Sequence, residues 1–174
     1  TEDGFCVKYS PEGTKLWSTY IGTDGTPAGQ ESYPSISTDA SGNVFLLMQT
    51  GVQAPTTTGV HSTTIGSGNA DRYLLKLNPD GGAMLWATYI GASGNLAGSV
   101  YRGTMHVLPS GDVLVGGAVP DGVASPLVGF GTGYQQARSG NFDGYVVKIN
   151  GSNGTGIWGT YFGGPDIDHI SSMA

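Results

Sequence analysis

Short runs of alternating hydrophobic and polar residues recur along the chain, and they predict β-strands. In the first run Phe5, Val7 and Tyr9 fall on one side of the backbone, and Cys6 and Lys8 fall on the other. This period of two is expected of a strand. No stretch keeps the apolar period of 3.6 that a long helix needs, and Gly or Pro interrupts most candidate windows. The pattern therefore predicts an all-β protein of many short strands.

One two-stranded unit occurs three times. It reads DGFCVKYSPEGTKLWSTYIG from Asp3, DRYLLKLNPDGGAMLWATYIG from Asp71 and DGYVVKINGSNGTGIWGTYFG from Asp143, at spacings of 68 and 72 residues. A turn rich in Pro, Asp, Asn and Gly separates the two runs of each copy, so each copy is predicted to be a β-hairpin. All three tryptophans share one position of the unit and three of the four lysines share another: Trp17, Trp86 and Trp158, and Lys8, Lys76 and Lys148.

A second pair of strands is predicted between the hairpins, at residues 34–50 and again at 103–119. The central turns of the two pairs, SGN and SGD, match each other. Residues 166–174 look like the opening of a third such pair. Long Gly-, Ser- and Thr-rich loops cover 51–70 and 120–142. One period of about 70 residues thus contains four short antiparallel strands.

Four-stranded antiparallel units in tandem are typical of β-propeller blades, because each small sheet buries its faces only against neighbouring sheets. Residues 1–174 are therefore expected to form one partial β-propeller. Eleven strands do not close a ring, so the chain is predicted to be a fragment of a longer propeller or to complete a ring with other copies. The expected parts are an outer half-blade at 3–22, blades at 33–91 and 102–163, and the start of the next blade at 166–174.

Several motifs resemble the bacterial SBBP β-propeller repeat over nearly the whole chain. They are D-x-[FY]-x-[VL]-K, LWSTYIG and LWATYIG, the SGN turn, and the loop PTTTGVHSTTIGSGNAD. The resemblance is specific in the hairpins and weaker at 92–142, where the Tyr-Pro-Ser entry of residues 33–35 has no counterpart. It implies a propeller in a large exported bacterial protein, secreted or at the cell surface, often with adhesive modules. It also implies that the strand beginning PSISTDA is innermost, that the Trp strand is outermost, and that no enzymatic activity is established.

Charge and cysteine content exclude several classes of function. A net charge of −6 with only seven basic residues argues against nucleic-acid binding. No apolar run approaches the about 20 residues that span a bilayer, so membrane insertion is not expected. The single cysteine, Cys6, stands where the other copies have Leu74 and Val146, which predicts a buried apolar thiol and not a nucleophile.

No motif predicts catalysis. The chain has no nucleophile elbow, P-loop or dinucleotide fingerprint. His61, His106 and His169 occupy non-equivalent positions without zinc-ligand spacing. Residues present in every copy are expected to serve the sheet itself, and the tryptophans are expected to pack between sheets more readily than to stack on sugars. No catalytic residue is therefore predicted.

Two loops contain candidates for ligand binding. A propeller could present a ligand surface in the loop YQQARSGNF, although the same loop could instead pack over the sheet edge. Acidic turns at 23–31 and 163–169 could bind calcium, or could be solvated turns without a cofactor. The ligand-binding candidates are Tyr134, Gln135 and Arg138, and the calcium candidates are Asp24, Glu31, Asp166 and Asp168.

The leading expectation is a non-catalytic extracellular or cell-surface propeller module that acts as a scaffold, adhesion or protein-interaction domain. Its partners would be other blades of the same protein or other protein chains. The alternative is a glycan-binding or glycan-processing propeller whose site is completed by blades outside this chain, with surface glycans as partners. A third hypothesis is an intracellular protein-interaction propeller.

Overall fold

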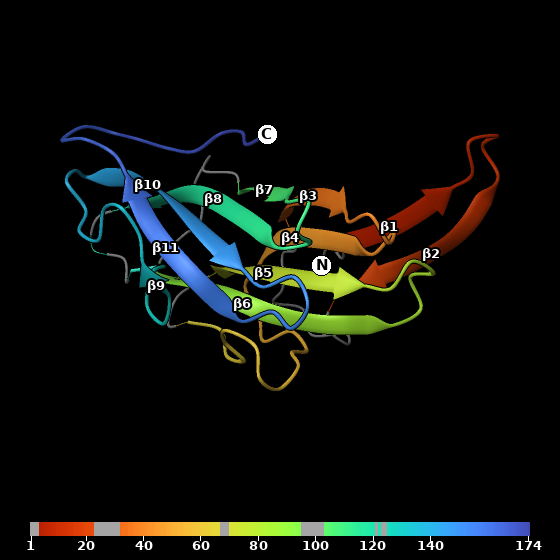
Figure 1. The fold of residues 1–174 in the computed structure, drawn as a ribbon. Coiled ribbons are helices and arrows are strands. Elements are labelled where there is room, and N and C mark those ends of the chain that lie inside the picture. The colour runs from red at the N-terminus through yellow and green to blue at the C-terminus, as the bar shows by residue number, and fades with distance from the viewer. Residues whose placement is uncertain (1–3, 23–31, 67–69, 95–102, 121, 123–124) are drawn as a thin grey trace.

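The chain forms several antiparallel β-sheets, which confirms the all-β class. A computed structural model describes residues 4–22, 32–66, 70–94, 103–120, 122 and 125–174. These residues contain eleven strands in three sheets and no helix, so none of them forms a helix that could cross a membrane. Figure 1 shows the three sheets placed in chain order, with the second between the other two.

Sheet one is a hairpin of β1 (Gly4–Tyr9) and β2 (Lys15–Ile21). Its register places Lys8 opposite Trp17, and a bulge follows Lys8. The same bulge follows the equivalent lysine in the hairpins of the other two sheets. The repeated sequence therefore folds to the same local geometry three times, since a bulge at one fixed place sets the twist and the side-chain directions.

Sheet two has four strands in chain order: β3 (Ser32–Thr38), β4 (Val44–Thr50), β5 (Ala70–Leu77) and β6 (Met84–Gly94). All seven residues of β4 are buried, so the sheet is covered on both faces. One face packs against sheet one and the other packs against sheet three. Cys6 is buried in the first of these contacts, as expected, and burial raises the pKa of its thiol.

Sheet three has five strands in the order β7-β8-β10-β11-β9. They are β7 (Thr104–Val107), β8 (Val113–Pro120), β9 (Gly131–Thr132), β10 (Phe142–Ile149) and β11 (Gly156–Phe162). The short β9 lies within the predicted loop and pairs in parallel with β11. Sheet three therefore has one strand more than the expected four, because the loop turns back and pairs with the outer edge of β11.

The hydrophobic core consists of two layers, one on each side of sheet two. The layer between sheets one and two contains Leu46, Leu75 and Tyr89. The layer between sheets two and three contains Phe45, Trp86 and other buried side chains. Alternate residues of each strand of sheet two thus face opposite neighbours, because successive side chains point to opposite faces of a sheet.

The C-terminal residues run across sheet three and form no strand (Figure 1). Ile167 makes an isolated parallel bridge with Phe142, and the Ile170 amide donates to the Gly117 carbonyl at 3.4 Å. The segment 166–174, expected to begin a further sheet, therefore lies on the outer face of β8 and β10.

Candidate functional site

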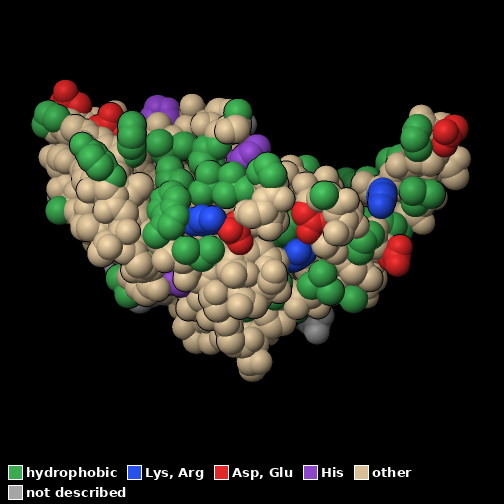
Figure 2. Space-filling model, in the orientation of Figure 1, with side chains coloured by type: hydrophobic (Ala, Val, Ile, Leu, Met, Phe, Trp, Pro, Cys, Tyr) green, Lys and Arg blue, Asp and Glu red, His purple; other side chains and the backbone are tan. Residues whose placement is uncertain are grey.

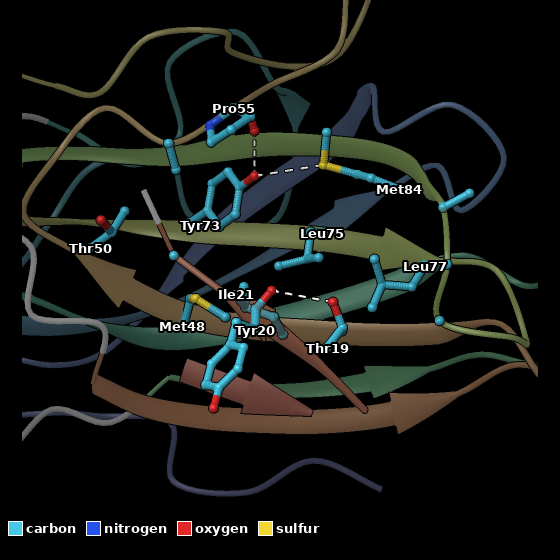
Figure 3. Close-up of a pocket in the computed structure, with 15 residues that line it drawn as sticks. Thr19, Tyr20, Ile21, Met48, Thr50, Pro55, Tyr73, Leu75, Leu77 and Met84 are labelled. Carbon is cyan, nitrogen blue, oxygen red and sulfur yellow. Dashed lines mark hydrogen bonds between the residues drawn. The ribbon is translucent and has the colours of Figure 1, made fainter. Parts of the chain in front are cut away.

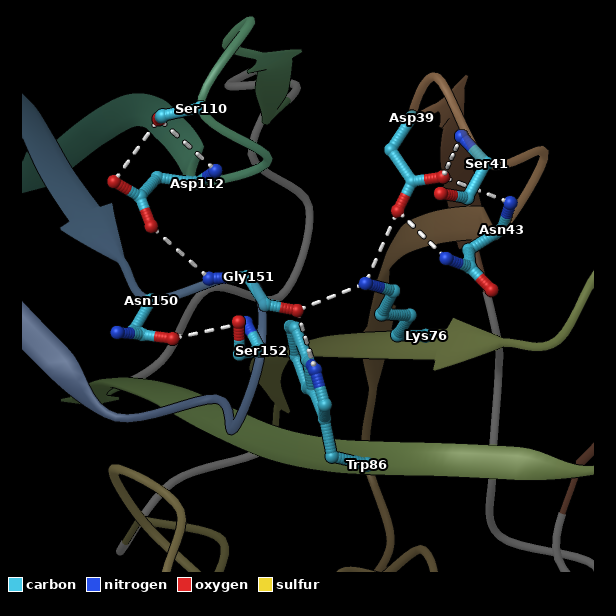
Figure 4. A network of polar contacts seen from close by, with 10 residues as sticks. All are labelled: Asp39, Ser41, Asn43, Lys76, Trp86, Ser110, Asp112, Asn150, Gly151 and Ser152. Carbon is cyan, nitrogen blue, oxygen red and sulfur yellow. Dashed lines mark hydrogen bonds and ion pairs between the residues drawn. The ribbon is translucent and has the colours of Figure 1, made fainter.

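The repeated lysine and tryptophan join neighbouring sheets. Lys76 Nζ and Trp86 Nε1 of sheet two both donate to the Gly151 carbonyl of sheet three, at 2.9 and 3.0 Å (Figure 4). The Lys76 ammonium also lies 4.7 Å from the centroid of the Phe45 ring. We call this contact of a lysine and a tryptophan with one turn carbonyl of the next sheet the latch.

A second latch connects sheet one to sheet two. Lys8 Nζ and Trp17 Nε1 donate to the Pro79 carbonyl at 3.2 and 3.0 Å. Pro79 and Gly151 are both the second residue of their hairpin turns, so the acceptor is repeated as well as the donors. Packing and hydrogen bonding between sheets therefore account for these shared side chains.

The repeated lysines of sheets two and three each also pair with an aspartate in the turn between the first two strands of their own sheet. Lys76 lies 3.1 Å from Asp39, and Lys148 lies 2.8 Å from Asp112. Burial opposes ionisation of Asp39, but hydrogen bonds from Asn43 and Lys76 outweigh it, so the pKa of Asp39 is below its ordinary value. The hydrogen bond from Lys148 is the main cause that lowers the pKa of Asp112.

A polar cleft of about 500 Å³ opens beside the latch between sheets two and three. Turn residues around Asp39 and Ser110 form its walls, together with Lys76 and His106. Hydroxyl, carboxylate and backbone groups line it, which suits a polar ligand such as a sugar better than an apolar one. Figure 4 shows that Lys76 and the Asp39 carboxylate are already bound to protein partners, so a ligand would meet a preformed network.

An apolar cavity of about 220 Å³ lies between sheet one and sheet two (Figure 3). Met48, Leu75 and Leu77 line it, and the Tyr73 hydroxyl at its wall donates to the Pro55 carbonyl. Burial, with a smaller contribution from the nearby Tyr89, raises the pKa of Tyr73, which keeps this phenol a donor. The cavity offers hydrophobic contact and a hydroxyl that is already engaged.

The ligand candidates of the loop around residue 135 have different environments. Tyr134 is 94% exposed. The Gln135 side-chain amide donates to the Ala137 carbonyl at 3.0 Å, and Arg138 Nη1 donates to the Pro120 carbonyl at 2.6 Å. Arg138 and the backbone of Gln135 thus hold the loop against sheet three, the Gln135 side chain bonds within the loop, and Tyr134 presents its ring to solvent.

The calcium candidates are only partly described. Asp24 and Glu31 lie outside the described residues. Asp166 is exposed, and Asp168 Oδ2 accepts a hydrogen bond of 2.7 Å from the Gly164 amide. Within the part of the chain that the structure describes, no group of three or more His, Cys, Asp or Glu side chains could hold a metal ion.

A buried carboxylate, Asp143, lies close to Asp168. Asp143 is fully buried, and its Oδ2 accepts a hydrogen bond from the Ser139 amide at 2.7 Å. Its Oδ1 has no hydrogen-bond partner among the described residues. A methyl group on Gly163 would meet both Asp143 Oδ1 and, at 3.0 Å, Asp168 Oδ2, so the two carboxylates flank the same backbone position.

Replacing Asp143 with Asn is expected to raise the free energy of unfolding by about 1 kcal/mol. The Asn side chain keeps an oxygen that accepts from the Ser139 amide, and it places an NH₂ donor where Oδ1 has no hydrogen-bond partner, on the side of Asp168. Asp71, at the same repeat position, is the matched control: its oxygens accept from the Gly66 and Arg72 amides, so Asp71→Asn should be destabilising. Urea denaturation measures both. If Asp143 instead bound a calcium ion, Asp143→Asn would lower the free energy of unfolding. EDTA would then lower the melting midpoint of the unsubstituted protein and leave that of the variant unchanged.

The His61 ring is partly buried against sheet three. It stacks on Phe130 with ring centroids 4.0 Å apart, and the His61 amide donates to the Gly154 carbonyl at 2.9 Å. Burial lowers the pKa of His61 below its ordinary 6.5. The neutral imidazole is therefore the form that the folded chain favours.

Stability is expected to fall as the pH drops below about 6.5, because the unfolded chain then binds the His61 proton more strongly than the folded chain does. His61→Phe keeps the stack and should flatten this dependence while leaving stability at pH 7.5 nearly unchanged. His169→Phe, on an exposed residue, should leave the dependence in place. Urea denaturation between pH 5 and 7.5 measures the free energy of unfolding at each pH. If this free energy changed with pH as steeply in His61→Phe as in the unsubstituted protein, His61 would not be the cause.

The sequence interpretation missed Arg72. It stands where the other hairpins have Gly4 and Gly144, yet it is only 4% exposed. Methyl groups on Gly103 and Gly117 would lie 2.5 and 3.1 Å from its guanidinium nitrogens, so these two glycines make room for it. The sequence did contain a signal for Arg72: two hairpins begin with Asp-Gly-aromatic, and only the hairpin of sheet two has arginine in place of the glycine.

Comparison with known proteins gives no relative: no family model matches the chain, and no curated protein matches it.

Proposed function

We propose that the chain is part of a β-propeller that serves as a non-catalytic extracellular scaffold, adhesion or protein-interaction module. The latch is the observation that carries this proposal. A lysine ammonium, a tryptophan indole and a turn carbonyl meet in the same way between sheets one and two and between sheets two and three. This repetition is expected of near-identical units stacked in sequence. Rigid stacked sheets with polar turns at one end suit a scaffold for binding other macromolecules.

Two further features support the propeller. Sheet two is buried on both faces, which a sheet flanked by sister sheets requires. Gly116 of β8 and Leu47 of β4 hold the same position in their sheets, and each contacts the chain segment that follows its own sheet. Ile170 of the C-terminal segment lies against Gly116, and Gly103 beside β7 lies against Leu47. The SBBP-type motifs support placement outside a bacterial cell.

A crystal structure of the protein that includes any neighbouring repeats tests the architecture. Four or more such sheets inclined around one axis are expected. Sheets that continue as an open stack without a common axis would contradict the proposal.

Attachment tests the role. Beads coated with the protein are expected to bind the surface of the producing cells, and this binding should survive Tyr134→Ala. Tyr134 is exposed and single-copy, so loss of attachment in that variant would favour a dedicated ligand site over a general scaffold.

The polar cleft favours glycan binding as a second candidate. Its volume and its hydroxyl, imidazole and backbone groups match a sugar residue. A glycan array is the test: binding that is lost in His106→Ala would support this candidate, and an array without any bound glycan would count against it.

A further inference from the structure

The outer face of sheet three carries a third set of latch donors. Register places Leu114, Lys148 and Trp158 in one row, as it places Phe45, Lys76 and Trp86 in one row of sheet two. The row of sheet two is covered by sheet three, whereas Leu114, Lys148 and Trp158 remain partly exposed. Figure 2 shows hydrophobic surface over this sheet, interrupted by adjacent basic and acidic side chains.

The Trp158 indole has no hydrogen-bond partner among the described residues, and Lys148 pairs with Asp112 of its own sheet. In sheet two the same lysine pairs with Asp39 and still donates to the next sheet. The Lys148 ammonium therefore retains the capacity to donate to a second acceptor. Both donors of a latch are in place without the carbonyl that completes it.

The opposite end of the molecule carries the matching acceptor. The turn at Pro11 has the geometry of the turn at Pro79: Gly13 donates to Ser10 as Gly81 donates to Asn78, each at 3.0 Å. Pro11 is the second residue of its turn, the position that supplies the carbonyl in both latches.

The outward face of the hairpin β1–β2 is apolar and uncovered. Tyr20 is 85% exposed, whereas its equivalents Tyr89 and Tyr161 are 0% and 2% exposed. Phe5 is 69% exposed, against 3% for Tyr73 at the same position. A groove of about 310 Å³ runs between these side chains. In sheets two and three this face is the one that packs on the preceding sheet.

We propose that a second copy of this chain docks head to tail on sheet three. Lys148 and Trp158 of one copy donate to the Pro11 carbonyl of the next, and the face around Phe5 and Tyr20 packs on the hydrophobic surface of sheet three. The second copy is chosen because the chain itself carries both halves of the contact. The hairpin of sheet one supplies both donors of one latch, so a latch does not need four strands on its donor side. The contact repeats one found twice within the chain and does not require a closed ring.

Variants that block one end each provide the test. Lys148→Ala with Trp158→Ala removes the donors, and Phe5→Glu with Tyr20→Glu disrupts the acceptor face; all four residues are at least partly exposed, so the fold should persist. Sedimentation velocity of the unsubstituted chain at increasing concentration is expected to show dimers and larger species. Each blocked variant alone should remain monomeric, and an equimolar mixture of the two should form a dimer and nothing larger.

Loss of the Trp158 anchor alone should weaken association at least about thirtyfold, as for a central aromatic of an interface. Tyr134→Glu, which changes an exposed aromatic on neither face, should associate as the unsubstituted chain does. A chain that stays monomeric throughout, a donor-blocked variant that still self-associates, or a mixture that does not dimerise would overturn the proposal. Each of these results leaves the propeller proposal standing, because that proposal depends on the two latches within the chain.

Discussion

Trp86→Ala is expected to lower the free energy of unfolding by about 3–5 kcal/mol, the range for removing a large buried aromatic. Trp86 is 3% exposed and meets the edge of Phe45 with ring centroids 5.9 Å apart. Its indole also donates to Gly151, and a methyl group on Gly154 would lie 2.9 Å from its ring. The substitution thus removes core volume and half of a latch together.

Trp158→Ala is the matched control. It changes the same residue type at the same repeat position, but on the outer face of sheet three, and should cost about 1 kcal/mol because its side chain keeps solvent contact. Urea denaturation followed by far-ultraviolet circular dichroism, at a concentration low enough to keep the chain monomeric, measures both. Equal losses would mean that Trp86 does not couple sheets two and three.

Gly151→Ala is expected to lower the free energy of unfolding by about 3 kcal/mol. The added methyl group would overlap the Gly111 carbonyl of the neighbouring turn, and backbone cannot move aside as a flexible side chain can. Any shift of this turn also moves the carbonyl that receives Lys76 and Trp86. A change in the tryptophan fluorescence of the native protein should accompany the loss of stability, and it should be absent in a Trp86→Phe background.

Gly82→Ala tests the same chemistry in the equivalent hairpin turn of sheet two. A methyl group there meets nothing within 4 Å, and the backbone is not in the left-handed region. Stability should stay within about 0.5 kcal/mol or rise slightly, since alanine restricts the unfolded chain. A similar loss in both variants would show that turn flexibility, and not the contact at Gly111, is responsible.

The sequence was sufficient to predict the hairpins because their signal is local. Alternation around Val7, a turn with Pro11 and the recurrent Trp17 specify two paired strands without reference to the rest of the chain, and the structure contains them three times. Repetition also indicated that the lysines and tryptophans serve the sheets, although it could not show that they share one carbonyl acceptor.

Features that occur only once in the chain could not be predicted from the sequence. β9 arises where the loop at Gly131 returns to β11, and a two-residue strand leaves no periodic pattern. The polar cleft is formed by turns from two sheets, so residues such as Asp39 and Ser110 meet only after the sheets stack. The candidate site could not be predicted for the same reason.

The fit of Arg72 gives the chain a means of fixing the order of its own units. Near-identical sheets risk misassembly during folding, because one hairpin face resembles another. Arg72 needs glycine opposite it, and sheet two carries Met48 at the position that Gly117 holds in sheet three. A second copy of sheet two could therefore not pack on sheet two, because its Met48 would meet Arg72. The small residue at position 117 makes sheet three the neighbour that fits.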